Sequence, residues 1–186
     1  DDSDINSRLS QAVGSPLSLW PLLPKDQLDH YRRTPPPPGT DMEASLREAF
    51  ARTESEPLPD LSGFPKELFE FESPPGTYFD AYPILLMSTG SLETMRARSA
   101  NDAIQYDIRR FRPNLLVELP GVFPENDWIG RQVKIGSVVL KVESTCPRCV
   151  MTTHGFRDLD KEPLVMRELV KQNNGDLGVY CTVREP

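Results

Sequence analysis

Hydrophobic and polar residues alternate over short runs in the second half of the chain, a pattern typical of β-strands joined by tight turns. The clearest case is residues 132–143, where the alternation continues on both sides of Gly136-Ser137. A Gly-Ser dipeptide suits the two-residue hairpin turn of type II′, because glycine accepts the positive φ of its first position. The segment therefore predicts a β-hairpin whose second strand leads directly to Cys146.

Short apolar runs predict three further strands, at residues 81–89, 114–119 and 177–183. The first is expected to lead into a short helix that runs through Met95 and is capped by Ser88, Thr89 or Ser91. Strands outnumber helices and short turns join several of them. We therefore predict a mainly β fold with peripheral helices, mostly antiparallel and barrel-like.

Two segments have hydrophobic residues at helical spacing. In residues 41–53 this spacing follows Thr40, and Glu43 stands three residues later, a combination that predicts a capping box and a helix covering the core. Pro163, expected at the first helical position, opens the second segment, and Gly175 follows its last turn as a candidate C-cap.

Proline separates the first part of the chain from the rest. Most of the 19 prolines lie within residues 16–75, and the run Pro35–Pro38 can only form extended polyproline II, which predicts a connector or a surface strap. A length of 186 residues is typical of one domain, so residues 1–186 are predicted to form a single domain.

The charge balance argues against two classes of partner. The chain carries 21 Lys and Arg against 28 Asp and Glu, whereas binding to nucleic acid or to an anionic membrane needs a broad cationic surface. No apolar stretch approaches the ~18 residues of a membrane-spanning helix. Three cysteines are too few for a disulfide framework, so a reducing, cytoplasmic location is expected.

Two of the three cysteines stand in "STCPRCVMTT", residues 144–153. A zinc site built from Cys146, Cys149, His154 and Cys181 is one possibility. No second Cys pair is present, however, and Cys181 shares a strand face with Val179 and Val183, which predicts a buried hydrophobic role for it. A dithiol redox pair needs a helix start after the first cysteine, and the following residues are β-branched and interrupted by glycine. A single thiolate beside Arg148 is the third possibility.

The segment "IRRFRPN", residues 108–114, concentrates three arginines in an otherwise acidic chain. If it is extended, Arg110 and Arg112 project to the same side and form an anion-binding surface; otherwise they are solvated or paired at the surface. Asp80 is either a turn residue or an acceptor in a pocket. No Ser-His-Asp spacing and no nucleotide-binding glycine motif is present, so neither that hydrolase chemistry nor ATP or dinucleotide binding is expected.

Four motifs then follow one another in a familiar order: "RRFRPNLLVEL", "WIGRQVKIGSVVLKV", "CPRCVMTT" and "GVYCTV". Together they resemble the MOSC domain, the molybdenum cofactor sulfurase C-terminal family, which includes the mitochondrial amidoxime-reducing component. The resemblance spans residues 79–183. It implies a MOSC-type, mostly antiparallel β-barrel and a molybdenum pyranopterin cofactor, with Cys149 as catalytic residue and metal ligand and Cys146 in a secondary position.

The resemblance also implies a set of cofactor-binding residues. Arg112 and Asn114 match residues that hold the pterin and its phosphate, and Asp80 matches an acidic residue near the pterin. Tyr82 replaces a serine of the family, and His154-Gly155-Phe156 replaces its usual Val-Asp-Pro after the matched threonines. The full expected set is Asp80, Tyr82, Arg112, Asn114, Arg148 and Thr152.

Both ends of the chain depart from the family pattern. Residues 4–22, "DINSRLSQAVGSPLSLWPL", resemble the segment that follows an N-terminal β domain in longer relatives. Residues 1–40 are therefore interpreted as a connector and strap from a missing domain. The sequence stops before the strand that usually closes the barrel. These departures predict weakened or lost cofactor binding.

The resemblance leads to an enzymatic hypothesis: an oxidoreductase that reduces N-hydroxylated or N-oxygenated small molecules at molybdenum. No flavin, haem or iron–sulfur motif is visible, so the electrons are expected from a separate donor protein. One alternative is a sulfur carrier or sulfurtransferase with a persulfide on Cys149. The other is a non-catalytic binding module.

Overall fold

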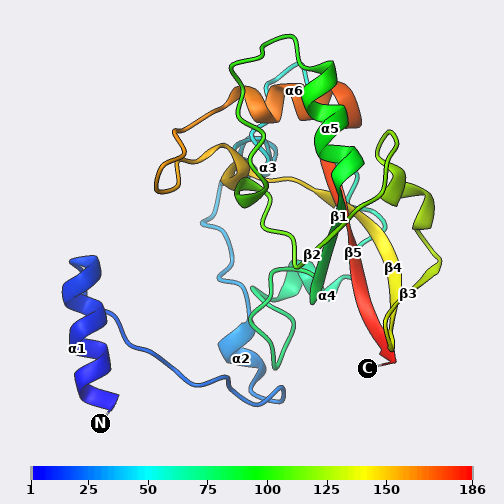
Figure 1. Ribbon diagram of the computed structural model, residues 1–186. Coiled ribbons are helices and arrows are strands. Elements are labelled where there is room, and N and C mark those ends of the chain that lie inside the picture. Colours follow the sequence, from blue (N-terminus) through cyan, green and yellow to red (C-terminus); the bar gives the residue numbers. More distant parts are fainter. Residues whose placement is uncertain (1, 186) are drawn as a thin grey trace. The chain divides into compact units, whose positions relative to one another are not determined.

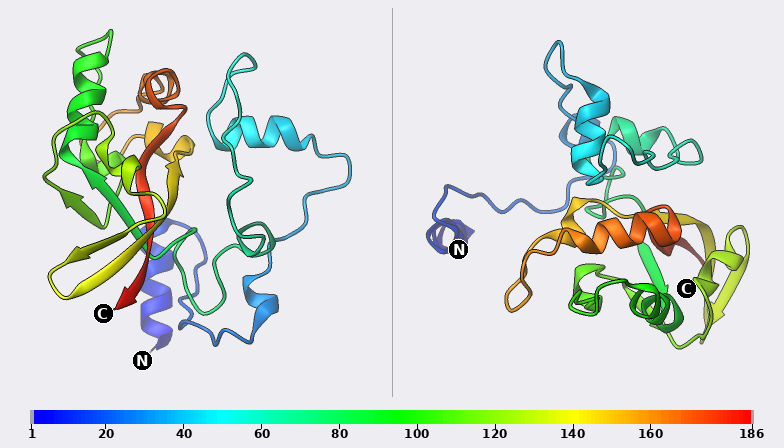
Figure 2. Two further views of the ribbon diagram at one scale, coloured as in Figure 1. Left: turned by 90° about the vertical axis from the view of Figure 1, so that its right-hand side faces the viewer. Right: turned by 90° about the horizontal axis from the view of Figure 1, so that it is seen from above.

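The computed structural model describes residues 2–185, with side chains from residue 4 onward. These residues divide into two compact units (Figures 1 and 2). The first contains the chain up to residue 34 together with residues 65–81, and the second contains residues 35–64 together with the chain from residue 82 onward. The single domain and the connector role of residues 1–40 stay predictions.

The described part of the first unit contains three helices, α1 (Asp2–Val13), α2 (Leu28–Tyr31) and α4 (Glu67–Glu70). A short antiparallel bridge between Arg32 and Phe71 joins its two segments. Tyr31 and Phe71 are buried there, and Arg33 forms an ion pair with Glu72. Two buried aromatic rings, an ion pair and this isolated bridge therefore join the two segments of the first unit.

A mixed sheet dominates the second unit and curls into a half-barrel (Figure 1). In the described residues it has five strands in the order β2-β1-β5-β4-β3. Only the β1–β2 pair is parallel, and the others are antiparallel. The predicted mainly β fold with peripheral helices is thus confirmed. The strands are β1 (Ile84–Ser88), β2 (Leu115–Val117), β3 (Gln132–Ile135), β4 (Val138–Pro147) and β5 (Asp176–Glu185).

The predicted hairpin is formed by β3 and β4, with Ile135 opposite Val138. Gly136 has φ of +62°, as a two-residue turn of type II′ requires at its first position. Because β4 continues to Pro147, Cys146 is still part of the sheet, whereas Cys149 lies beyond its end.

The helices of the second unit confirm some predicted boundaries and correct others. α5 (Thr89–Arg98) begins after Ser88, whose side chain accepts a hydrogen bond from the Ser91 amide, and α6 (Leu164–Asn173) follows Pro163.

α3 spans Met42–Ala49, shorter than predicted. Its N-cap is Asp41, which accepts from the Ala44 amide, because the Thr40 hydroxyl instead donates to the Pro37 carbonyl. The capping box was therefore wrong, and no residue of α3 is buried, so its predicted core-covering role was also wrong.

The core lies on both faces of the sheet. α5 and α6 pack side by side over one face (Figures 1 and 2) and enclose a cluster that contains Met87, Met95, Phe111 and Leu169. The other face carries a smaller cluster around Leu86, Val142 and Cys181. Adjacent strand residues point to opposite faces, so Leu86 and Met87 of β1 belong to different clusters.

Candidate functional site

The arginine-rich segment is not extended. Residues Ile108–Arg110 form a 3-10 turn, η1, which the Asp107 side chain caps by accepting from the Arg109 amide at 2.9 Å. Phe111 is fully buried in the core, and Arg112 follows in the left-handed conformation with φ of +53°. The cap and the burial of Phe111 favour a turn, so the condition under which Arg110 and Arg112 would project to one side, an extended segment, is not met.

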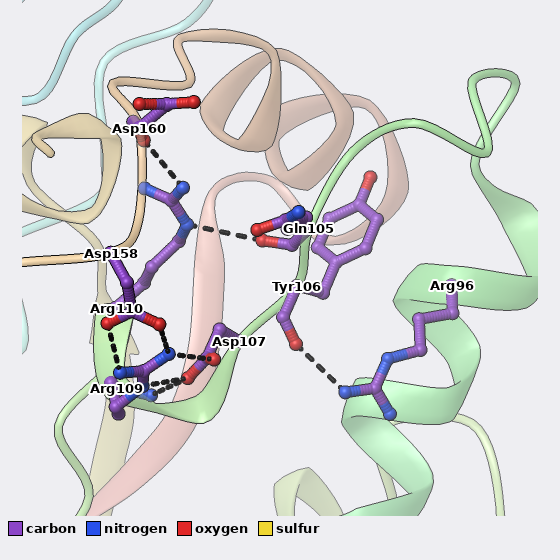
Figure 3. Close-up of polar contacts among 8 residues, drawn as sticks. All are labelled: Arg96, Gln105, Tyr106, Asp107, Arg109, Arg110, Asp158 and Asp160. Carbon is purple, nitrogen blue, oxygen red and sulfur yellow. Dashed lines mark hydrogen bonds and ion pairs between the residues drawn. The ribbon is translucent and has the colours of Figure 1, made fainter. Parts of the chain in front are cut away.

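The guanidinium of Arg110 binds backbone carbonyls and not an anion. Arg110 is 6% exposed, and its guanidinium donates to the carbonyls of Gln105 at 3.2 Å and Asp160 at 2.7 Å (Figure 3). It also donates to the carbonyl of His154 at 3.1 Å. Three carbonyl acceptors occupy the planar donor fork, and a buried guanidinium needs such partners. Arg110 thus fastens residues 154–160 to η1.

Arg109 adds an exposed ion-pair network to the same junction. Its guanidinium bonds Asp107 and Asp158, each at 2.8 Å at the shortest (Figure 3). The side-chain hydrogen bond from Arg109 lowers the pKa of Asp107 to about 2. The same partner lowers the pKa of Asp158. Both neighbouring arginines therefore hold the loop that follows the cysteine motif.

Replacing Asp107 with asparagine is expected to lower stability at neutral pH and to have less effect in acid. The pKa of Asp107 is depressed in the folded chain, so its stabilising contribution is present above its ordinary value of 3.8 and is lost as the pH falls through about 2. Urea unfolding of the parent and the Asp107→Asn variant at pH 7, 4 and 2 measures this convergence. Asp102→Asn, at an exposed position of the preceding loop, is the control. A stability difference that is constant across this range would contradict the assignment.

Arg148 contacts the first cysteine of the motif. Its buried guanidinium donates to Cys146 Sγ at 3.1 Å and to the Phe111 carbonyl at 2.6 Å, and it stacks over the Phe111 ring. Sequence reasoning placed Arg148 beside a reactive thiolate. In the structure its hydrogen bond goes to the buried Cys146, and the adjacent Cys149 is the more accessible thiol.

The three cysteines occupy different environments. Cys146 and Cys181 are buried, and burial raises the pKa of both, that of Cys181 to about 11. The buried position predicted for Cys181 is confirmed. Cys149 is half-buried and immediately precedes the 3-10 turn η3 (Val150–Thr153), where the Thr152 hydroxyl donates to the Cys149 carbonyl at 3.0 Å. Within the described residues no group of three or more His, Cys, Asp or Glu side chains could hold a metal, so the four-ligand zinc site is not formed.

Alkylation of the native protein is expected to modify Cys149 and to spare the other two thiols. Thiolates react and thiols do not, so burial and a raised pKa protect Cys146 and Cys181. Iodoacetamide treatment at about pH 8, followed by peptide mass spectrometry, measures the order of reaction. Treatment in urea should label all three. Equal native rates at Cys149 and Cys181 would contradict this description.

The other predicted site residues have defined positions. The side-chain oxygen of Asn114 accepts a hydrogen bond from the backbone amide of Leu85 at 2.8 Å. The backbone amide of Asn114 donates to the Leu85 carbonyl, so this residue joins the arginine-rich segment to β1. Tyr82 stacks on Tyr180 with ring centroids 5.1 Å apart. Asp80 is exposed and belongs to the first unit, whereas the rest of the set belongs to the second.

Two arginine clamps hold the two motif-bearing segments together. Arg148, which precedes Cys149, donates to the carbonyl of Phe111, which precedes Arg112. Arg110 donates to the carbonyl of His154, the residue that follows η3. The half-buried thiol and the exposed Arg112 thus lie on directly joined segments. Sequence reasoning missed the role of Arg110, because a buried structural arginine and an anion-binding arginine look the same in a sequence.

A comparison with protein families identifies the family to which the chain belongs. The MOSC domain pattern matches residues 74–186, and the chain belongs to the MOSC domain family. It is similar to mitochondrial amidoxime-reducing component 1 of Mus musculus, with 38% identity over 91 residues, 47% of this chain and 25% of that protein. Mitochondrial amidoxime reducing component 2 of Bos taurus is 36% identical over 76 residues, 41% of this chain and 21% of that protein. The Danio rerio component 1 is 32% identical over 117 residues, 58% of this chain and 34% of that protein.

The matched stretches span about a quarter of these two mammalian relatives. Family and relatives together support a function related to the molybdenum cofactor. The names of the relatives include the word mitochondrial, and the cytoplasmic location stays a prediction. Across the described residues, every helix is too short or too polar to cross a lipid bilayer.

Proposed function

We propose that this chain provides the molybdenum-cofactor site of an oxidoreductase that reduces N-hydroxylated or N-oxygenated small molecules, with Cys149 as the metal ligand. The supporting observation is the accessibility of Cys149. Of the three thiols it alone is not buried, and its segment is bonded to the one that carries Arg112. The names of the amidoxime-reducing relatives support the substrate class.

The residues present fit the cofactor in their chemistry. A molybdenum centre accepts a soft thiolate, and the planar guanidinium of Arg112 suits a phosphate group. Arg112 is exposed, whereas Arg110 and Arg148 are occupied by carbonyl and sulfur acceptors. Cys149 would therefore hold the metal and Arg112 the anionic part of the cofactor, and Arg148 would act as a positioning residue.

When bound, the cofactor would supply two-electron redox chemistry. Removal of the oxygen from an N-hydroxylated substrate consumes two electrons and two protons, breaks the N–O bond and releases water. The electrons would come from a separate donor protein, because the sequence contains no flavin, haem or iron–sulfur motif. The protein supplies the thiolate, the orientation of the cofactor and the electrostatic surroundings.

Elemental analysis of the protein made in a cofactor-producing host tests the proposal. We expect the parent chain and Cys181→Ala to carry equal amounts of molybdenum, and Cys149→Ala to carry none. Circular dichroism checks that both variants are folded. Molybdenum retained by Cys149→Ala, or zinc in place of molybdenum in the parent chain, would contradict the proposal.

The same protein tests the alternative of a sulfur carrier. A persulfide adds about 32 Da to a cysteine, so intact-mass spectrometry after incubation with a sulfur donor detects it. That added mass on Cys149 without bound metal would favour the carrier over the oxidoreductase.

A further inference from the structure

A second candidate site lies on the helix-covered face of the sheet, formed by residues that the proposed function does not use. It is an open cleft with a volume of about 350 Å³ between α5, η1 and β2. Ligand pockets usually enclose about 300–1,000 Å³, so this cleft has the size for a small molecule. All of its lining residues belong to the second unit.

One face of α5 forms a wall of the cleft. Its lining residues follow one another at positions i, i+3, i+4 and i+7, the spacing that places side chains on one side of a helix. They are Thr89, Leu92, Glu93 and Arg96. The rest of the lining comes from Asp107 and Ile108 of the η1 region and from Leu116 of β2.

The floor of the cleft is apolar. Leu92 is buried and Ile108 is half-buried against the core, whereas Leu116 is 48% exposed on a strand at the edge of the sheet. An apolar ligand group seated here would remove exposed Leu116 surface from water, which is favourable by roughly 25 cal/mol for each Å² buried. The floor therefore favours a ligand with an apolar body.

The rim carries charges of both signs. The guanidinium of Arg96 donates to the Tyr106 carbonyl at 2.9 Å, which holds it at the cleft (Figure 3), and this bond uses only one of its five donors. Glu93 is exposed, and among the described residues no ion pair is formed by its carboxylate. Asp107 adds a second carboxylate, which is already bonded to Arg109.

The spacing of Glu93 and Arg96 limits the ligand further. Side chains three residues apart on a helix have Cβ atoms about 5–6 Å from each other, yet these two do not form an ion pair with each other. A ligand with an ammonium and a carboxylate on one carbon can present both charges within that distance. Arg96 would receive the carboxylate and Glu93 the ammonium, and the floor would receive the side chain.

We propose that the cleft between α5, η1 and β2 binds a zwitterionic α-amino acid with an apolar side chain, through Arg96, Glu93 and the Leu92–Ile108–Leu116 floor. The Arg109–Asp107 ion pair would leave Arg96 as the free cation of the rim. This site is independent of Cys149, so its test needs no bound cofactor.

The test is a titration of the isotope-labelled full chain with L-phenylalanine, followed by amide NMR signals. We expect saturable shifts at Glu93, Ile108 and Leu116 with a dissociation constant of about 10 μM to 1 mM. Two analogues test the contribution of each charged group to binding: 3-phenylpropionate lacks the ammonium, and phenethylamine lacks the carboxylate. Each should bind about tenfold more weakly than phenylalanine, as expected for the loss of one charge-assisted contact.

Glu93→Gln and Arg96→Gln should each weaken phenylalanine binding about tenfold. Arg98→Gln, an exposed change on the same helix outside the cleft, should leave binding unchanged. The positions are exposed, and the amide spectrum of each variant verifies its fold. Shifts confined to residues outside the cleft, no shifts at all, or full affinity in both Glu93→Gln and Arg96→Gln would overturn the proposal.

Discussion

Replacing Glu125 with alanine is expected to lower the free energy of unfolding by about 3–5 kcal/mol. Glu125 lies in the 3-10 turn η2 (Pro124–Trp128) and is fully buried. Its carboxylate accepts hydrogen bonds from the Ser88 hydroxyl at 2.5 Å and from the Ser91 hydroxyl at 2.7 Å. Alanine would remove this acceptor and leave a cavity where β1 passes into α5.

The position of Glu125 at a helix start adds to the expected loss. Ser88 caps α5, and the positive end of the helix dipole favours a carboxylate at this point. Alanine would therefore weaken the cap, the hydroxyl network and the packing of η2 on β1 together. Effects on residues in one network are coupled, so the total need not equal a sum of parts.

Urea unfolding of Glu125→Ala and of two companion variants measures the effect. Glu125→Gln keeps the size and one acceptor oxygen, so its loss should be smaller, about 1–2 kcal/mol. Glu118→Ala removes an exposed carboxylate from a neighbouring segment and should change stability by less than about 0.5 kcal/mol. Equal small losses for Glu125→Ala and Glu118→Ala would show that the buried carboxylate contributes little.

Replacing Arg148 with methionine is expected to cost about 2–3 kcal/mol and to loosen the segment that carries Arg112. Methionine keeps an unbranched apolar stem but cannot donate to the Phe111 carbonyl or to Cys146 Sγ. A buried carbonyl without its partner costs free energy. The Nε atom of Arg148 is itself buried without a hydrogen bond, which keeps the expected loss moderate.

Two measurements distinguish this clamp from simple packing. Urea unfolding gives the loss of stability, and hydrogen exchange should become faster at the Arg112 amide, which bonds the Ile108 carbonyl in the clamped turn. Arg98→Met, at an exposed position of α5, should alter neither quantity. Unchanged exchange at Arg112 in a destabilised Arg148→Met variant would refute the clamp while leaving a packing role.

Local patterns predicted the elements of the second unit well where alternation, turn chemistry and capping agreed. The hairpin turn at Gly136 and the cap at Ser88 follow from interactions within a few residues, and the alternation along β5 predicted the buried face on which Cys181 lies. α3 shows the opposite case. Thr40 and Asp41 are adjacent, and both residue types can cap a helix. The Thr40 hydroxyl donates to the Pro37 carbonyl, and the Asp41 side chain accepts from the Ala44 amide and caps the helix.

The candidate site was predicted only in part. Motif resemblance indicated Cys149, and the structure shows that this thiol is the accessible one. The carbonyl partners of Arg110 and Arg148 could not be predicted, because these acceptors lie between 5 and 50 residues away along the chain. A carbonyl exists at every position and therefore carries no sequence signal.

By itself, the sequence determined the family, through the resemblance of its motifs, and the strand-rich architecture, through local periodicity and turn chemistry. Only the tertiary structure decided which arginines are buried clamps and which is exposed, and that Glu125 is enclosed at the start of α5. Burial and hydrogen-bond partnership arise when distant segments meet, and no residue type specifies its own surroundings.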